Sequence, residues 1–223
     1  MVNIILQHFD GDLRPLDKLS MANMQEYAKM VGAEYKLVTG KPFNPKLTAP
    51  CQKVQMIQEE FDEYDDVLMV DIDMFAPKGM TINVFEEQGV GMYHTVQRML
   101  HRKLVHQYPL ITSARSPYWG GAIYKMDKNL RVALREADTF PNTWMENFNI
   151  PYHFEDEGIF HVLALRARID WRGTYLDPKW CQCSFLPEPE KAGFIHVRTK
   201  ITPQGPKREK MENYQQLVDE GIL

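Results

Sequence analysis

Apolar and polar positions repeat with two different periods along the chain, which predicts a succession of strands and helices. Short continuous apolar runs at 2–6 and 67–70 are typical of strands buried on both faces. At 16–30 the apolar positions recur every three to four residues and stop at Gly32, which predicts a helix. Further strands are predicted at 33–40, 89–95, 120–126 and 194–199, and further helices at 54–61, 96–107, 130–137, 155–167 and near the C-terminus.

The order of these elements indicates a fold class. Strands that alternate with helices of roughly 12 to 16 residues favour parallel pairing through right-handed crossovers. Asp127 is the expected N-cap of the helix that follows it. We therefore expect an α/β fold with a mixed, mostly parallel central sheet and helices on both faces. No internal repeat or Gly/Pro-rich linker divides the sequence, so one domain, 1–223, is expected.

Composition narrows the classes of partner. With 44% hydrophobic and 25% charged residues, the 223-residue chain can bury a full-sized core. A formal net charge of -4 provides no broad cationic field, which disfavours nucleic acid as a partner. No apolar run approaches the length of about 18 residues that a membrane span needs, and no signal peptide is recognisable at the N-terminus.

The cysteines indicate the redox environment. Cys51, Cys181 and Cys183 are odd in number, and no second Cys pair completes a zinc site. They are interpreted as reduced thiols, and a cytoplasmic location is expected, in the host cytoplasm if the protein is viral.

Two aspartates follow the apolar run 67–70. If the strand continues through them, Asp71 and Asp73 point to one face and Ile72 to the other. Two carboxylates about 5 Å apart repel by roughly 3 kcal/mol at an effective dielectric constant of 20. A divalent cation converts this repulsion into attraction, and oxygen ligands suit Mn²⁺ or Mg²⁺ bound to a diphosphate. The alternative is that the acids cap the turn that begins at Pro77.

A late strand offers a third ligand and two cations. His196 lies within the predicted strand at 194–199, and Arg198 and Lys200 follow it with a period of two. One sheet edge can then carry a metal ligand together with charges that neutralise phosphate. The alternative is a core histidine followed by surface charges.

Three further segments contain residues suited to a sugar site. Glu155, Asp156 and Glu157 crowd the first turn of a helix, where they cap it, bind sugar hydroxyls or act as a base. Gly120 and Gly121 follow two aromatic residues and allow close approach of a ligand, or form a bulge. A third segment is expected to be a solvated basic face, and it comprises His94, Arg98, His101, Arg102, Lys103 and His106.

Together these features form a familiar order. A helix carrying Lys53, a strand ending in D-x-D, a small-residue strand, an acid cluster opening a helix, and "YLDPKWCQC" before a strand with a histidine resemble the GT-A glycosyltransferases. The resemblance is to the glycogenin-like nucleotide-sugar transferases in particular and extends from Val2 to about Lys207. A narrower likeness is to soluble microbial and large-virus sugar transferases such as the chlorella-virus capsid glycosyltransferase.

The resemblance implies specific roles. Asp71, Asp73 and His196 would bind Mn²⁺ (or Mg²⁺), which holds the diphosphate of a UDP-sugar. Residues 1–95 would form the nucleotide-binding half and 96–223 the sugar and acceptor half. The remaining implied roles are base and ribose binding by Gln7, His8 and Phe9, donor binding by Lys53, and donor-sugar contact by the acid cluster, Asp156 above all. The chain departs from the family where it has "YWGGA" and "HVRTKITPQGPK".

The expected activity is metal-dependent transfer of a sugar from a nucleoside diphosphate sugar to a hydroxyl of a glycan or glycoprotein acceptor. Two alternatives stay open at this point. A phosphohydrolase of the haloacid-dehalogenase type also has D-x-D, although on its first strand and with Thr or Val where this chain has Phe75. A sugar-nucleotide or carbohydrate binding module without turnover would have the same sequence features. A nucleotidylyltransferase is disfavoured because no glycine-rich phosphate loop follows the first strand.

Overall fold

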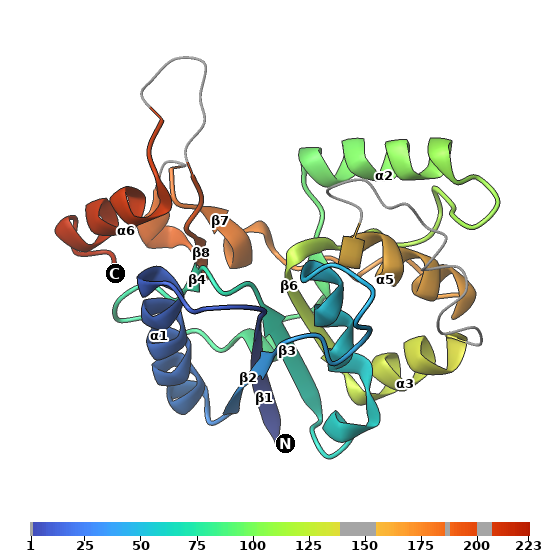
Figure 1. Ribbon diagram of the computed structural model, residues 1–223, viewed down its shortest axis with the longest axis horizontal. Helices are drawn as coiled ribbons and strands as arrows, with labels where there is room; N and C mark the ends of the chain where they lie inside the picture. Colours follow the sequence, from blue (N-terminus) through green and yellow to red (C-terminus); the bar gives the residue numbers. More distant parts are fainter. Residues whose placement is uncertain (1, 139–154, 186–187, 200–206) are drawn as a thin grey trace.

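A mixed five-stranded sheet forms the centre of the protein (Figure 1). The computed structural model describes residues 2–138, 155–185, 188–199 and 207–223. The strand order is β2-β1-β3-β6-β5. Three strands are mutually parallel, namely β1 (Asn3–Phe9), β2 (Glu34–Thr39) and β3 (Asp66–Val70). The fourth, β6 (Gly120–Asp127), runs antiparallel to both β3 and β5 (Gly91–Met92). The expected mixed, mostly parallel sheet is confirmed.

A second, three-stranded sheet continues from the carboxyl end of β3. Its order is β4-β8-β7, and its strands are β4 (Met74–Phe75), β7 (Gln182–Cys183) and β8 (Ile195–His196). β8 pairs antiparallel with β4, so that Met74 lies opposite His196. A segment near the C-terminus is thereby joined to the chain that immediately follows β3.

The helices follow the predicted order. The α-helices within the described residues are α1 (Pro15–Val31), α2 (Thr95–Gln107), α3 (Lys128–Ala137), α5 (Glu155–Arg166) and α6 (Lys210–Asp219). The 3-10 turns are η1 (Pro50–Ile57), η2 (Glu59–Phe61), η3 (Val84–Glu86), η4 (Pro178–Cys181) and η5 (Pro189–Lys191). Among the described residues, no helix is both long and apolar enough to cross a bilayer.

The predicted α-helix at 54–61 is wrong in type. Its sequence forms η1 and η2, which are separated by the extended residue Gln58. Val54 and Ile57 are three residues apart, a spacing that fits the three-residue turn of a 3-10 helix as well as an α-helix. The apolar pattern alone did not distinguish the two.

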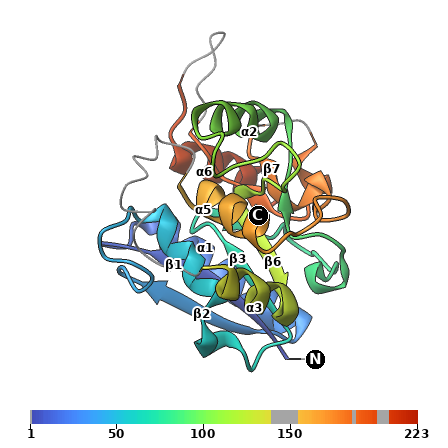
Figure 2. The same cartoon turned by 90° about the vertical axis from the view of Figure 1, so that its right-hand side faces the viewer.

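Alternation along the strands produces a core on each face of the sheet. Ile4 and Leu6 of β1 pack with η1 and α5, whereas Ile5 packs with α1. In β3, Val67 and Met69 pack in the same cluster as Ile4 and Leu6, whereas Leu68 and Val70 pack in the same cluster as Ile5. Figures 1 and 2 show α1 on one side of the sheet and α3 and α5 on the other. Helices therefore cover both faces, as expected.

Local signals determined the ends of two helices correctly. Asp127 Oδ1 accepts a hydrogen bond from Leu130 N at 2.7 Å and caps α3. Gly32 adopts the left-handed conformation, with φ 70°, and ends α1.

Two predicted strands are shorter than expected. The run 89–95 contributes only β5, and 194–199 contributes only β8. After β8 the carbonyl oxygen of Arg198 accepts a hydrogen bond from the side chain of Asn213 in α6, at 2.6 Å. A side chain thus occupies a backbone acceptor that a longer strand would use, and the ladder stops.

Candidate functional site

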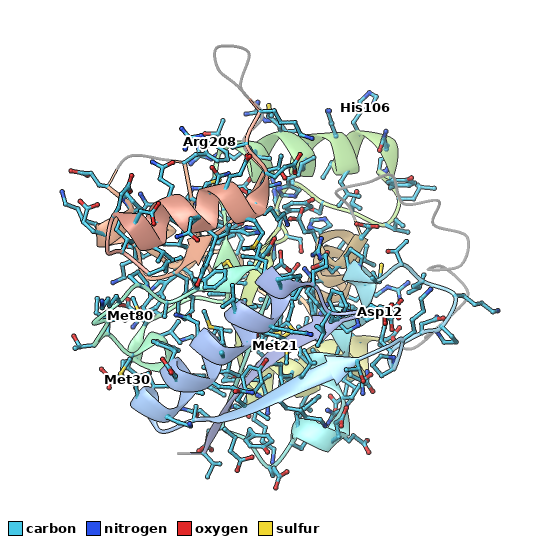
Figure 3. All side chains as sticks on the ribbon, turned by 60° about the vertical axis from the view of Figure 1, so that its left-hand side comes forward. Asp12, Met21, Met30, Met80, His106 and Arg208 are labelled. Carbon is cyan, nitrogen blue, oxygen red and sulfur yellow. The ribbon has the colours of Figure 1, made fainter. Side chains whose placement is uncertain are left out.

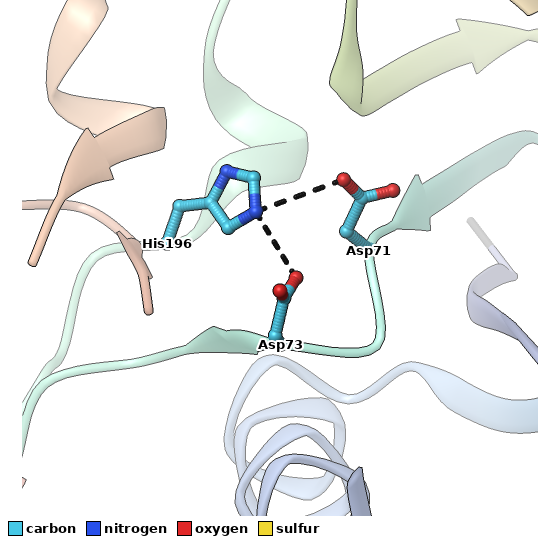
Figure 4. A group of neighbouring side chains, drawn as sticks. All are labelled: Asp71, Asp73 and His196. Atoms are coloured by element: carbon cyan, nitrogen blue, oxygen red, sulfur yellow. Dashed lines mark ion pairs between the residues drawn. The ribbon is translucent and has the colours of Figure 1, made fainter. Parts of the chain in front are cut away.

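The two aspartates lie in a tight turn between β3 and β4. Val70 is the last residue of β3, and Met74 N donates to Asp71 O at 3.1 Å, which closes the turn. The expectation that the aspartates share a strand face is therefore wrong, because the chain turns at once into the second sheet. Their carboxylates nevertheless approach the same point in space (Figure 4).

Strand pairing brings His196 to these carboxylates. Because Met74 lies opposite His196 across β4 and β8, the imidazole reaches back over the turn. Its Nε2 atom lies 3.0 Å from Asp73 Oδ1 and 3.8 Å from Asp71 Oδ2. Nδ1 faces the other way, 3.9 Å from Cys181 Sγ. One ligand atom from each of the three residues lies within 4.8 Å of the others.

The surroundings keep Asp73 ionised. Its side chain is only 7% exposed, and burial alone would raise the pKa of the carboxyl group. The charges of His196 and Lys210 outweigh this effect and hold the pKa of Asp73 below its ordinary value. His196 contacts Oδ1, and the Lys210 ammonium group contacts Oδ2.

The donor set fits a divalent cation of the Mn²⁺ or Mg²⁺ type. Two carboxylates and one imidazole supply hard oxygen ligands and one nitrogen ligand. Two ligands on opposite sides of such an ion lie about 4 Å apart, so the observed separations need only small side-chain shifts. Cys181, beside Nδ1 of His196, helps to fix which ring nitrogen faces the aspartates.

Lys53 connects the aspartate turn to the acid cluster. Its ammonium group lies 2.9 Å from Asp71 Oδ1 and 2.7 Å from Asp156 Oδ2, and it also donates to Gly121 O. Burial opposes the charge on Lys53, but the attraction of the two carboxylates wins and raises its pKa. This buried cation balances acids from two separate parts of the chain.

The acid cluster at the start of α5 is held by tyrosines. Tyr124 OH donates to Asp156 Oδ2 at 2.9 Å. Tyr118 OH donates to one oxygen of Glu157, and Gly121 N donates to the other at 2.7 Å. Burial, followed by the neighbouring charge of Asp156, raises the pKa of Glu157 to about 7. Capping of the helix alone does not require such specific partners.

A cavity of about 700 Å³ joins the two groups of acids. Asp71 and His196 line it together with Lys53, Asp156 and Arg198. Glu155, Glu157, Gly120 and Gly121 line it as well, along with the first residues of α2. Residues predicted at 53, 71, 120–121, 155–157, 196 and 198 are thus brought together at the carboxyl end of β3.

The paired glycines are needed for close packing at this cavity. A Cβ atom on Gly121 would lie 2.9 Å from Asp156 Oδ2, and one on Gly120 would lie 2.8 Å from Gln97 Nε2. At Gly121 the backbone of β6 therefore lies so close to the acid cluster that a side chain there would force the Asp156 carboxylate to shift.

Other predicted residues lie elsewhere. Gln7 is fully buried: its amide nitrogen donates to Ser20 Oγ and Asp71 O, and its amide oxygen accepts from Tyr35 OH. The side-chain amide of Gln7 thus has partners on both its nitrogen and its oxygen, and one of them is the aspartate turn. The role of Gln7 in base and ribose binding stays a prediction.

His8 and Phe9 do not line the cavity described above, and their base-binding role stays a prediction. Nε2 of His8 lies 2.7 Å from Gly40 O. Lys200 lies outside the described residues. The expected solvated basic face is wrong for His101, which is buried against Tyr118. His106 does project outward from α2 (Figure 3).

Sequence reasoning missed Lys210 and Tyr124 as functional candidates, and it raised Tyr118 only as an aromatic face beside the paired glycines. Lys210 is 137 residues from Asp73, and no local pattern signals their contact. The two tyrosines lie on either side of the paired glycines in the sequence, which is a weak signal. Buried tyrosine hydroxyls need hydrogen-bond partners, and the acids at the start of a helix can provide them.

No family model and no curated protein matches the sequence. The fold is that of the GT-A glycosyltransferases. A glycosyltransferase involved in the glycosylation of the major capsid of PBCV-1 is similar over 97% of this chain and 98% of its own, with a TM-score of 0.58 and 14% identity.

Two further solved structures share this fold. The galactosyltransferase LgtC, in complex with donor and acceptor sugar analogs, covers 97% of this chain and 95% of its own, with a TM-score of 0.55 and 12% identity. Mouse xyloside xylosyltransferase 1, in its apo form, covers 88% and 97%, with a TM-score of 0.52 and 11% identity.

Proposed function

We propose that this protein is a metal-dependent glycosyltransferase that moves a sugar from a nucleoside diphosphate sugar, a UDP-sugar in the first instance, to an acceptor hydroxyl of a glycan or glycoprotein. The observation that carries the proposal is the convergence of Asp71, Asp73 and His196 beside a cavity that also holds a buried acid cluster. The shared fold with known glycosyltransferases supports it.

In this proposal Asp71, Asp73 and His196 hold Mn²⁺ or Mg²⁺. When bound, such an ion neutralises charge on the departing diphosphate and lowers the barrier to breaking the anomeric bond. Arg198, which is exposed at the edge of the cavity beside His196, adds a cation on the same side. Gln7 keeps the turn in place by binding the carbonyl oxygen of Asp71.

The acid cluster is assigned to the sugar. Asp156 is held by Lys53 and Tyr124, so its orientation is fixed before a ligand arrives. An oriented carboxylate accepts hydrogen bonds from sugar hydroxyls or stabilises positive charge that develops at the anomeric carbon. Glu155 and Glu157 are proposed as the alternative acids for a base near the acceptor.

The haloacid-dehalogenase alternative loses its support. In that class the D-x-D motif belongs to the first strand, whereas here it follows β3, and the fold is that of glycosyltransferases. A binding module without turnover would have the same site, so an activity assay is needed to distinguish it from a transferase. Release of UDP from a UDP-sugar, faster with an acceptor, supports a transferase, whereas tight binding without release supports the module.

Calorimetric titration with UDP, ADP and GDP, each with and without Mn²⁺, tests the binding half of the proposal. We expect UDP to bind only when Mn²⁺ is present and Asp73→Ala to abolish this binding, because one metal ligand is lost. Asp170→Ala is the matched control, since Asp170 pairs with Arg172 at an exposed site outside the cavity. Equal binding by wild type and Asp73→Ala would remove the metal centre from the proposal.

A further inference from the structure

Lys210 occupies one oxygen of a proposed metal ligand. Asp73 Oδ1 faces His196 at 3.0 Å, and Oδ2 is in contact with the Lys210 ammonium group. Asp71 is balanced differently, by Lys53 at 2.9 Å. In this structure, then, both oxygens of Asp73 already have cationic or potentially cationic partners from the chain itself.

The helix that carries Lys210 is anchored independently of this ion pair. Lys210 is the first residue of α6, whose Asn213 side chain donates to Arg198 O. Leu217 packs into the apolar cluster below the second sheet, and the Tyr214 ring lies 5.1 Å from the ring of Phe75. Only the Lys210 side chain has to move for Asp73 to be released, and that side chain is 34% exposed.

The Lys210 ammonium group and a divalent ion on Asp73 repel each other, because both place positive charge beside one carboxylate. An ion that uses only Oδ1 binds against this repulsion, and an ion that also uses Oδ2 weakens or breaks the ion pair, after which the ammonium group is hydrated in solvent. The repulsion and the weakened ion pair both make metal binding less favourable. Asp73 is nearly buried, so the pair is screened less than a fully exposed one.

We propose that Lys210 is an internal competitor of the metal: it holds Asp73 in the absence of the ion and weakens the affinity of the site for Mn²⁺. This inference rests on the proposed function, since it takes Asp73 to be a metal ligand. The physiological consequence is that the site loads at a higher metal concentration than its three ligands alone would require.

The test is calorimetric titration of Mn²⁺ into the full chain without nucleotide. We expect Lys210→Met to bind Mn²⁺ about three- to tenfold more tightly than wild type, the range that a partly buried ion pair represents. Lys210→Arg keeps the positive charge and should stay near the wild-type affinity. Lys210→Gln is a second neutral replacement.

Lys207→Met is the control for the general loss of a positive charge. Lys207 pairs with Glu209 at 2.6 Å on an exposed surface and does not contact Asp73. Tighter binding by Lys210→Met and Lys210→Gln, but not by Lys207→Met, supports the competitor role. Unchanged or weaker Mn²⁺ binding by both neutral variants overturns the competitor role of Lys210 and leaves the proposed function standing. If wild type and all variants bind no Mn²⁺, the metal centre of the proposed function is itself overturned.

Discussion

At the residue scale the site depends on charges that satisfy one another in a buried space. Lys53 holds together Asp71 and Asp156, which lie 85 positions apart in the numbering. Removal of one buried partner would leave uncompensated charge, which commonly destabilises a protein by about 3 to 5 kcal/mol. Asp71 and Asp73 were predicted as site residues because like charges at the end of a buried strand demand a compensating cation.

Glu157 makes a prediction about pH. Its pKa in the folded protein is about 7, whereas its ordinary value is 4.5. Between these values the folded protein keeps a proton that the unfolded chain has released, so this residue makes stability fall as the pH rises. We expect Glu157→Gln to be stabilised relative to wild type more at pH 8 than at pH 5, by about 2 to 3 kcal/mol.

Urea unfolding of both proteins at the two pH values measures this difference. Groups that do not interact with Glu157 titrate in wild type and variant alike, so their effects cancel in the comparison. A difference that does not change between pH 5 and pH 8 would contradict the raised pKa of Glu157.

The contacts of Gln7 and Lys210, which the sequence did not predict, share a cause. Gln7 lies within β1, and its amide turns inward to Ser20 and the aspartate turn. Lys210 is brought to Asp73 only by the packing of α6. Side-chain direction and contacts between distant segments follow from tertiary packing, and no local pattern in one sequence records them.

At the element scale β6 brings its backbone into the wall of the cavity. Gly121 donates its N–H to Glu157 and accepts from Lys53, so its backbone is itself part of the site. The sequence correctly predicted a strand that begins at the paired glycines. It also predicted the major helices, because their apolar periods and caps are local. The second sheet was not predicted, since two-residue strands carry no period.

The two glycines of β6 differ in what they contact. A methyl group on Gly121 would meet the Asp156 carboxylate, which Lys53 and Tyr124 hold in place, whereas one on Gly120 would first meet the end of the flexible Gln97 side chain. We expect Gly121→Ala to lower the free energy of unfolding by about 1 to 3 kcal/mol.

Gly120→Ala is the matched variant, and it should cost less, because Gln97 can turn aside at the cost of the hydrogen bond that its Oε1 accepts from His94 N. Urea denaturation of wild type and both variants checks the difference. An equal loss of stability in the two variants would mean that the acid cluster yields as easily as the glutamine.

At the scale of the whole molecule the proposed metal site connects two sheets. Asp71 follows β3 of the central sheet, and His196 belongs to β8 of the second. A ligand that engages both should stabilise the native protein against unfolding. At 100 times the dissociation constant, binding adds about 2.7 kcal/mol, which corresponds to a rise of about 5 to 10 °C in Tm for a protein of this size.

Thermal unfolding with Mn²⁺ and UDP together is the measurement. We expect the rise in wild type and none in Asp73→Ala. The same rise produced by UDP without metal would show that the nucleotide binds independently of the three ligands.

The fold class was predictable from the order of elements, because alternating strands and helices leave few possible topologies.

The pairing of Met74 with His196 has a consequence for how the chain tolerates change. Neighbouring side chains of a strand point to opposite sides, so a single residue inserted or deleted between Phe194 and His196 would turn the imidazole away from Asp73. A slip of one position in this two-residue ladder would leave the central sheet intact and remove His196 from the proposed metal site. Length variation is therefore expected to be excluded from this short segment while the surface loops accept it.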